Sequence, residues 1–432
     1  MVIETKEQYS ALLKSVQNKD VDIVVIGDDH RNHPVESGVV MASLKVDSKI
    51  YDIVFNHSES FSELSMADLT GVKRFWVDAA KNFYHLTGFE NIYDVRLMNW
   101  ANESFFDDPS PSNVFDFIYS HSPRRGNEIV PLVKVLEYSR DRLMYIDKMK
   151  QDLSITKHAL RYNTAAIALA KIECAGMKLR GDVFDTIFKN GYGYSNYIMF
   201  TSTGRPSNTF RGINFGALNK TDGTRRNILS RFDSGMLVEF DYDAYHLRLL
   251  GDILDFEFPI DKSLHQYFAD EVYHTSYDEA KEKTFQILYG NYPIDEEKNP
   301  FFYGVDRLAH AIQDYFSQNK CFKSHIYNKP FSMENVIDVN KNKLLNYYIQ
   351  SYETERNLGV IKEVQDYLQE KNTKMILYTY DSFLFDFDMN EGLNTIKDLK
   401  NIVESKRFPT RIGAGTDYDS LTDITEKLHE YK

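Results

Sequence analysis

The sequence predicts a mixed α/β protein with two domains. Its 432 residues are enough for about two or three domains of ordinary size. Strand-like and helical patterns alternate along the chain, which begins with a group of apolar strands and continues through long helical stretches. Hydrophobic residues make up 42% and charged residues 27% of the chain, a composition that excludes a disordered or fibrous protein.

The overall charge excludes a protein that coats nucleic acid by bulk charge. Lys and Arg number 51 against 64 Asp and Glu, so the net charge is −13, which still allows a local basic cleft. Two cysteines, Cys174 and Cys321, exclude a disulfide scaffold. No apolar run approaches the ~20 residues that span a bilayer, so we expect a soluble, cytoplasmic protein without a membrane partner.

The first 150 residues are expected to open with a sheet. Apolar composition and intervening turn residues predict three strands, over 21–27, 38–46 and 49–55. A helix is expected over 76–86, where apolar residues recur at helical spacing. Two prolines in 107–113 predict a surface loop, and the pattern from 127 to 177 is again helical.

Basic residues are concentrated in 201–231. This segment carries six cations against one acid, Asp222, which gives it a charge of +5 in a chain of net −13. Taken alone, the cluster indicates a solvated basic loop. Its cations are Arg205, Arg211, Lys220, Arg225, Arg226 and Arg231.

Two aspartates follow or separate predicted strands. Residues 236–242 form an apolar strand with Asp241 near its end, and a helical pattern follows. Residues 374–388 contain two apolar strands that flank Asp381, which places this residue at a tight hairpin. Each aspartate alone is most simply interpreted as a turn or capping residue.

A helix is predicted over 276–290. Ser276 and Glu279 have the spacing of a capping box, and Gly290 is a suitable helix stop. A stripe on this helix is formed at every fourth position by Tyr277, Lys281, Phe285 and Tyr289. An amphipathic core helix is the simplest interpretation, but a cation with aromatic rings on one face also suits a triphosphate and its base.

The order and spacing of these segments resemble the family A DNA polymerases, the group that includes bacterial DNA polymerase I and many phage replicases. Five segments match over roughly residues 160–432: Thr203-Gly204-Arg205 with Ser207; Asp241-Tyr242-x-x-x-x-Leu247-Arg248, similar to motif A; Lys281-x-x-x-Phe285-x-x-x-Tyr289-Gly290, similar to motif B; Asn346-x-x-x-Gln350; and Tyr380-Asp381, similar to motif C.

This resemblance implies a phage-type, template-directed DNA polymerase. Its substrates would be primer-template DNA and deoxynucleoside triphosphates, and a processivity or replisome protein is a further expected partner. Asp241 and Asp381 would hold two Mg²⁺ ions, which Mn²⁺ can replace, with the Tyr242 carbonyl as a third ligand. Lys281 would neutralise the triphosphate and donate a proton to the departing pyrophosphate.

The resemblance also implies which side chains contact the substrates. The incoming nucleotide would contact His246, His265, Tyr277, Phe285 and Tyr289. The DNA would contact Arg205, Arg225, Arg226, Arg248, Asn346 and Gln350, with Arg225 and Arg226 on backbone phosphates.

The chain departs from the family pattern in four respects. Tyr277 replaces an Arg of motif B, His246 replaces the Glu of motif A, and Ser382 replaces the Glu after the motif C Asp. Gly204 follows Met177 by only 27 positions, since 204 − 177 = 27, so a thumb of the usual size does not fit between them.

Residues 1–150 resemble, more loosely, the RNase H-like 3′–5′ exonuclease domain that precedes the polymerase in this family. The expected Asp-x-Glu is Asp28-Asp29-His30, and another expected Asp is Phe83. Asp28 or Asp29, with Asp141, are the remaining metal-ligand candidates. We therefore expect a degenerate domain that has a structural or DNA-guiding role.

The expected organisation is an exonuclease-like domain over 1–150 and a polymerase domain over 151–432. In the latter, the palm comprises 171–264 and 331–432, and the fingers comprise about 265–330. Two alternatives stay open: a catalytically silent DNA-binding scaffold derived from a polymerase, and a 3′–5′ exonuclease. The paired aspartates favour the polymerase, because a scaffold needs no metal ligands.

Overall fold

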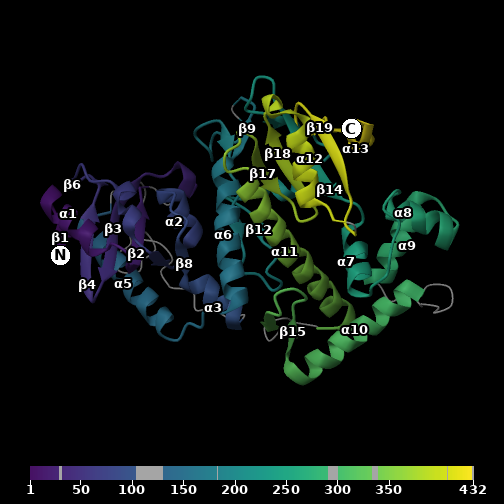
Figure 1. Ribbon diagram of the computed structural model, residues 1–432, viewed down its shortest axis with the longest axis horizontal. Coiled ribbons are helices and arrows are strands. Elements are labelled where there is room, and N and C mark those ends of the chain that lie inside the picture. The colour runs from purple at the N-terminus through teal and green to yellow at the C-terminus, as the bar shows by residue number, and fades with distance from the viewer. Residues whose placement is uncertain are drawn as a thin grey trace. The chain divides into compact units, whose positions relative to one another are not determined.

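The computed structural model describes residues 1–28, 32–103, 130–181, 183–289, 300–332, 339–405 and 407–430. The chain divides into two compact units, Met1–Cys174 with Thr186–Lys189, and Ala175–Asp185 with Asn190–Lys432 (Figure 1). The division follows Cys174, whereas the sequence suggested residue 150. Helix α6 (Lys157–Ala175) accounts for this difference, because Ile167 packs in the core of the first unit.

The first unit is built on a mixed six-stranded sheet with the order β1-β4-β3-β2-β7-β8. The central strands β2, β3 and β4 match the three predicted strands and are antiparallel, whereas β7 and β8 run parallel to β2. Strand β1 pairs in parallel with β4 at the edge. The bounds are β1 Val2–Ile3, β2 Asp20–Gly27, β3 Val39–Val46, β4 Lys49–Val54, β7 Arg74–Val77 and β8 Ile92–Asp94; β5 (Asn56–His57) and β6 (Ser60–Phe61) form a small hairpin.

Helices of the first unit follow the sequence with one correction. The predicted helix over 76–86 begins later, at Ala80, because Trp76 and Val77 belong to strand β7 and pair with β8. The predicted loop 107–113 lies outside the described residues. The helices are α1 (Lys6–Ser15), α2 (Ala80–Thr87), α3 (Val95–Glu103), α5 (Leu132–Gln151) and α6.

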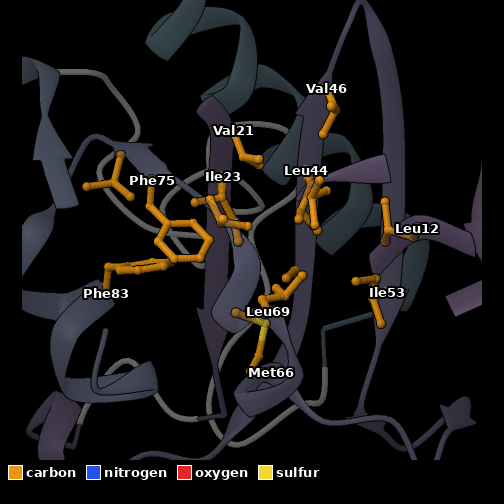
Figure 2. Packing of buried hydrophobic residues seen from close by; sticks show 14 of the residues in the cluster. Leu12, Val21, Ile23, Leu44, Val46, Ile53, Met66, Leu69, Phe75 and Phe83 are labelled. Carbon is orange, nitrogen blue, oxygen red and sulfur yellow. The ribbon is translucent and has the colours of Figure 1, made fainter. Parts of the chain in front are cut away.

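Phe83 lies inside the hydrophobic core of the first unit. Its side chain is 4% exposed, and its ring centroid lies 5.1 Å from that of Phe75. Figure 2 shows the two rings side by side, next to the apolar residues that β2 and β3 direct to the same face. This position is therefore a packing site, and it excludes a carboxylate that would hold metal.

The second unit is built on an antiparallel five-stranded sheet with the order β17-β18-β14-β19-β20. Strand β14 is central and matches the predicted strand 236–242, and the hairpin β17–β18 matches the predicted pair within 374–388. The bounds are β14 Met236–Tyr242, β17 Lys374–Tyr378, β18 Ser382–Phe387, β19 Thr410–Gly415 and β20 Thr422–Asp423.

Small sheets complete the second unit. One has three strands in the order β10-β9-β13, and two others pair β11 with β12 and β15 with β16. The bounds are β9 Met177–Leu179, β10 Tyr192–Gly193, β11 Tyr197–Ile198, β12 Ser207–Asn208, β13 Ile228–Leu229, β15 Cys321–Lys323 and β16 Pro330–Ser332. Among the described residues between β9 and Gly204, the chain contains no helix.

The long helix α11 (Lys341–Tyr367) is the main support of this sheet (Figure 1). Its Arg356 donates hydrogen bonds to the hydroxyls of Tyr242 (2.8 Å) and Tyr245 (3.0 Å), which ties the end of β14 to the helix. The other helices are α7 (Tyr245–Ile253), α8 (Leu264–Tyr267), α9 (Tyr277–Tyr289), α10 (Pro300–Asn319), α12 (Gly392–Val403) and α13 (Thr425–Glu430).

Helix α9 begins as the capping pattern predicts. The Ser276 amide donates to Glu279 Oε2 at 3.1 Å, and the Glu279 amide donates to Ser276 Oγ at 3.4 Å. Its expected stop, Gly290, lies outside the described residues. In the part of the chain that the structure describes, no helix combines the length and apolar character needed to cross a membrane.

Candidate active site

A cavity of about 1160 Å³ opens in the second unit, beside the end of β14. It brings together residues that are up to 222 positions apart in sequence, from Arg205 to Lys427 (427 − 205 = 222). The predicted site residues in its lining are Arg205, Asp241, Tyr242, His246, Arg248, His265, Tyr277, Lys281, Phe285, Tyr289 and Asp381. Those outside its lining are Arg225, Arg226, Asn346 and Gln350.

Asp241 and Asp381 are neighbours across the β14–β18 ladder. Asp241 pairs with Ser382, and the amide of Tyr242 donates to the carbonyl oxygen of Asp381 at 2.9 Å. The two aspartates are therefore fixed by backbone hydrogen bonds between adjacent strands. Each aspartate alone suggested only a turn or a cap, and it was the family resemblance that predicted their meeting.

The carboxyl groups of both aspartates are electrostatically crowded. Removal from water, together with repulsion from Asp381 and Glu239, raises the pKa of Asp241 to about 7. Removal from water and repulsion from Glu353 also raise the pKa of Asp381. Arg411 lowers the pKa of Asp241 only weakly, since its Nη2 lies 3.9 Å from Asp241 Oδ2. Such a site favours a bound cation.

The turn that carries Asp381 is strained and braced. Tyr380 has φ +71°, in the left-handed region that non-glycine residues seldom adopt. Its ring lies under the guanidinium of Arg205, with 3.7 Å between the Arg205 Cζ and the ring centroid. The Asn357 side-chain amide on α11 also donates to the Tyr380 carbonyl. Two contacts thus hold the turn beside the cavity.

The predicted stripe on α9 faces the cavity instead of the core. Tyr277, Phe285 and Tyr289 are 39%, 44% and 36% exposed, and Lys281 is exposed between them. The rings of Phe285 and Tyr289 are nearly parallel, at 19°, with centroids 6.1 Å apart. The buried face is formed by other residues, namely Ala280, Thr284, Ile287 and Leu288. The core interpretation of the stripe is therefore wrong.

His265 presents a buried ring to the same cavity. It is 7% exposed, and among the described residues its Nδ1 finds no hydrogen-bond partner. Burial, with a smaller contribution from nearby Lys281, lowers its pKa. An imidazole nitrogen left without a partner suits a polar group of a ligand.

His246 is held between two elements. Its Nδ1 lies 2.6 Å from the Tyr289 hydroxyl oxygen on α9, and its Nε2 lies 3.5 Å from Glu353 Oε1 on α11. Glu353 is 1% exposed and also pairs with Arg205, at 3.1 Å from Nε to Oε2. Burial, with a further contribution from Glu353, raises the pKa of Tyr289 to about 12.

Glu353 was missed by sequence reasoning. It lies on α11 at spacings of seven and three residues from Asn346 and Gln350, which places all three on one helix face. Gln350 Nε2 donates to Asn346 Oδ1 at 3.3 Å, and Thr203 Oγ1 donates to Gln350 Oε1 at 3.4 Å. The spacing of Glu353 from Asn346 and Gln350 was the signal in the sequence that could have identified it.

Glu239 was missed as well. It lies two residues before Asp241, on the same face of β14. Ser382 Oγ donates to its Oε1 at 2.9 Å, and the Tyr418 hydroxyl donates to the same oxygen at 3.0 Å. A third carboxylate therefore lies near the aspartates, although position 382 itself carries a serine.

Arg248 is placed differently from the expectation that it contacts DNA. Its side chain is 1% exposed, and its Nη2 donates to Asp243 Oδ2 at 2.7 Å. It also donates to the Pro259 carbonyl at 3.2 Å. This burial leaves no free surface for a phosphate, so Arg248 braces the start of α7.

Arg225 and Arg226 lie away from the cavity lining. The Arg225 guanidinium lies over the ring of Tyr418, with its Cζ 4.5 Å from the centroid. Arg226 Nε lies 2.6 Å from Asp419 Oδ2, and its side chain remains 70% exposed. The exposed guanidinium of Arg226 is accessible to solvent, whereas that of Arg225 is partly engaged.

The metal-ligand candidates of the first unit lie at its surface where the structure describes them. Asp28 and Asp141 are both exposed, and Asp29 lies outside the described residues, as does His30. The neighbouring Arg142 is buried instead and pairs with the Asp78 carboxylate. Burial is the largest influence on Asp78, and it raises the pKa of that carboxyl despite the arginine. An ion pair thus occupies the interior here.

The donor set of the cavity fits a magnesium ion. Across the described ranges, no group of three or more His, Cys, Asp or Glu side chains is arranged to hold a metal ion. Mg²⁺, however, usually binds through one or two carboxylates and takes its other ligands from phosphates and water. Asp241 and Asp381 supply that pair; burial and neighbouring carboxylates, Asp381 for Asp241 and Glu353 for Asp381, raise the pKa of each, and a cation would relieve this cost.

Comparison with known proteins identifies the fold. No family model and no curated protein sequence matches the chain. Among solved structures, it is similar to the POL domain of Pol1 from M. smegmatis, solved in complex with DNA primer-template and dNTP. The TM-score is 0.71 at 12% sequence identity, over 97% of this chain and 99% of that chain. The chain therefore has the fold of the POL domain of Pol1, the family A polymerase fold that its motifs predicted.

Proposed function

We propose that this chain is a template-directed DNA polymerase that adds deoxynucleotides to a primer 3′-hydroxyl. The observation that carries the proposal is the meeting of Asp241 and Asp381 in one cavity, opposite the exposed stripe of α9. The fold shared with Pol1, whose POL domain was solved with primer-template and dNTP, supports the same conclusion.

Asp241 and Asp381 are the proposed ligands of two Mg²⁺ ions, with Mn²⁺ as a substitute and the Tyr242 carbonyl as a third ligand. When bound, the ions activate the primer hydroxyl and stabilise the leaving pyrophosphate. Glu239 adds negative charge beside this pair, although it is not part of the cavity lining. The crowding of three carboxylates supports the proposal that this site binds cations.

The α9 side of the cavity is the proposed nucleotide site. Lys281 is exposed there and suits the triphosphate, to which it supplies a charge and a proton for the departing pyrophosphate. The unpartnered Nδ1 of His265 suits a phosphate oxygen. Phe285 and Tyr289 offer parallel rings to the base and sugar, and Tyr277 extends the same wall.

Primer-template DNA is the proposed partner of the α11 side. Arg205 lines the cavity, and Asn346 and Gln350 share a face of α11 with amide groups that suit base edges. Arg226 is exposed and suits a backbone phosphate, with Arg225 next to it. The short span between β9 and Gly204 supports a reduced thumb, and an external processivity protein is proposed to compensate.

The first unit is proposed to be an exonuclease-like domain without nuclease activity. Its mixed sheet and its place before the polymerase segments support the likeness, whereas buried Phe83 and the Arg142–Asp78 pair argue against metal binding. A separate 3′–5′ exonuclease function is therefore disfavoured. The scaffold alternative is disfavoured by the retained pair of aspartates.

Primer extension tests the proposal. The full chain is incubated with a labelled primer-template, four dNTPs and Mg²⁺, and we expect extension that Asp241→Asn abolishes. The matched control is Asp233→Asn, since Asp233 is exposed and lies outside the cavity lining. If the parent chain is inert with both Mg²⁺ and Mn²⁺ yet still binds the DNA, the scaffold function replaces the polymerase.

A further inference from the structure

One buried carboxylate connects three elements around the cavity. Glu353 projects from α11 and is 1% exposed. It pairs with Arg205, which precedes β12, and it lies 3.5 Å from His246 of α7. Through the hydrogen bond of His246 to Tyr289, its influence reaches α9. Glu353 thus links α11, directly or through His246, to three other segments of the chain.

The charge on Glu353 has to be compensated locally. A buried carboxylate is costly unless cations or donors surround it, and here Arg205 and His246 are the groups within ion-pair distance. Asp381 is a second negative charge close to Glu353, and repulsion from Glu353 contributes to its raised pKa. Arg205 is therefore drawn toward both carboxylates and held against the ring of Tyr380.

We propose that Glu353 is a positioning residue that orients His246 toward the sugar of the incoming nucleotide and Arg205 toward the primer end. This inference rests on the proposed polymerase function. It assigns sugar selection to a series of three contacting side chains on the cavity wall, Glu353, His246 and Tyr289. Although Glu353 belongs to the cavity lining, its two carboxylate oxygens lie next to Arg205 and His246, so it acts through these two side chains.

The geometry explains why His246 needs such a partner. An imidazole has two ring nitrogens, and a hydrogen bond at one leaves the ring free to rotate about its side-chain torsions. Here Nδ1 is directed to Tyr289 and Nε2 to Glu353, so both ends of the ring are held. A ring fixed at both ends forms a rigid wall against a 2′-hydroxyl. A ring held at only one nitrogen can rotate away and leave room for the 2′-hydroxyl.

Glu353→Gln is the direct test, because it keeps the size of the side chain and removes its charge. Single-nucleotide insertion gives kcat and KM for a dNTP and for the matching rNTP. We expect the dNTP-over-rNTP ratio of kcat/KM to fall by about tenfold or more, since losing one partner of a buried charge pair commonly weakens recognition by at least that factor. We expect the fall to come from a higher KM for dNTP and a lower KM for rNTP.

The matched control is Glu363→Gln, on an exposed face of the same helix. Its ratio should stay within about twofold of the parent, the range of ordinary surface substitutions. In the His246→Ala background, Glu353→Gln should cause no further fall, because the group that it positions is absent. Additive effects of the two substitutions contradict the series and overturn the inference.

An activity-independent measurement separates this inference from the proposed function. Urea unfolding of the parent, Glu353→Gln, Arg205→Gln and the double variant measures the coupling of the pair, and we expect the double variant to be less destabilised than the sum. If Glu353→Gln does not fold, Glu353→Asp keeps the charge but shortens its reach, and it should show an intermediate ratio. An unchanged ratio in an active parent overturns this inference alone, whereas an inert parent overturns the polymerase function and this inference together.

Discussion

Nδ1 of His246 lies 2.6 Å from the hydroxyl oxygen of Tyr289, and this contact joins helix α7 to helix α9 across the cavity. The two rings meet edge to face, with centroids 6.5 Å apart. Both residues line the cavity, so the pair connects the helix that follows Asp241 to the aromatic stripe of α9. A nucleotide bound in the proposed site would contact both side chains.

The first prediction concerns sugar selection. We expect the parent chain to prefer deoxynucleotides and His246→Ala to admit ribonucleotides, because removing the imidazole opens room for a 2′-hydroxyl. The measurement is the ratio of kcat/KM for dNTP over rNTP. His310→Ala is the control, since His310 is exposed on α10 and lies outside the cavity lining. An unchanged ratio in His246→Ala shows that the histidine is not the selecting group.

The second prediction concerns the pH dependence of stability. The pKa of Asp241 is raised from 3.8 to about 7 in the folded chain, so the folded chain holds a proton between these values that the unfolded chain has lost. The free energy of unfolding therefore falls as pH rises through this window. In EDTA at pH 8 we expect Asp241→Asn to stabilise the chain, whereas near pH 4 it should have little effect.

The expected gain at pH 8 is about 1–3 kcal/mol, because one pKa unit is worth about 1.4 kcal/mol and partial exposure reduces the total. Urea unfolding at the two pH values measures it, and Asp233→Asn is the exposed control. Adding Mg²⁺ at pH 8 should stabilise the parent more than the variant. Equal stability of parent and variant at pH 8 argues against crowding at this site.

The third prediction concerns proofreading. We expect no Mg²⁺-dependent trimming of a 5′-labelled single-stranded oligonucleotide. Phe83 lies in the hydrophobic core, and the Asp78 carboxylate is already paired with Arg142. The measurement is a time course on a denaturing gel, made with the Asp241→Asn variant so that polymerase activity does not contribute. Robust trimming that Asp28→Ala abolishes would show that the interpretation of the first unit is wrong.

The fourth prediction concerns the stability of the first unit. Phe83→Ala removes a ring packed 5.1 Å from Phe75, so the free energy of unfolding should fall by about 3–5 kcal/mol. Phe61→Ala is the control, because this ring is 72% exposed, and its change should stay within about 0.5 kcal/mol. Urea unfolding measures both, and equal effects contradict the core placement of Phe83.

The fifth prediction concerns the grip on DNA. The chain carries a net charge of −13, and its described residues contain no helix between β9 and Gly204 where a thumb is expected. Since affinity for the duplex depends on phosphate contacts, synthesis should be short, distributive and strongly reduced by salt. A tethering partner should restore length by raising the local enzyme concentration. Long products from the isolated chain under single-encounter conditions contradict this.

The parts predicted correctly from the sequence were those set by local pattern. Apolar runs bounded by turn residues located β2, β3, β14 and β18, and placed Asp241 and Asp381 at strand ends. The helix over 76–86 was misplaced at its start, because Trp76 is compatible with both periods. Its place in β7 is decided by pairing with β8, a contact that no short window of sequence contains.

Burial of charged side chains was the part that could not be predicted. Glu353 and Arg248 are both nearly inaccessible, although Glu and Arg are among the residues most often exposed. Each is buried because a partner from another segment neutralises it, Arg205 for Glu353 and Asp243 for Arg248. Such pairs depend on tertiary contacts. Spacing along α11 suggested only that Glu353 shares a face with Gln350.

The left-handed backbone of Tyr380 has a consequence for laboratory evolution. A tyrosine at φ +71° carries a strain of about 1–2 kcal/mol that glycine avoids. Its ring, however, holds the Arg205 guanidinium at 3.7 Å beside Asp381. A library screened for heat resistance alone will therefore favour Tyr380→Gly and lose the ring that orders this arginine. Thermal stability and catalytic activity therefore conflict at Tyr380, so a more stable variant has to be sought by substitutions at other positions.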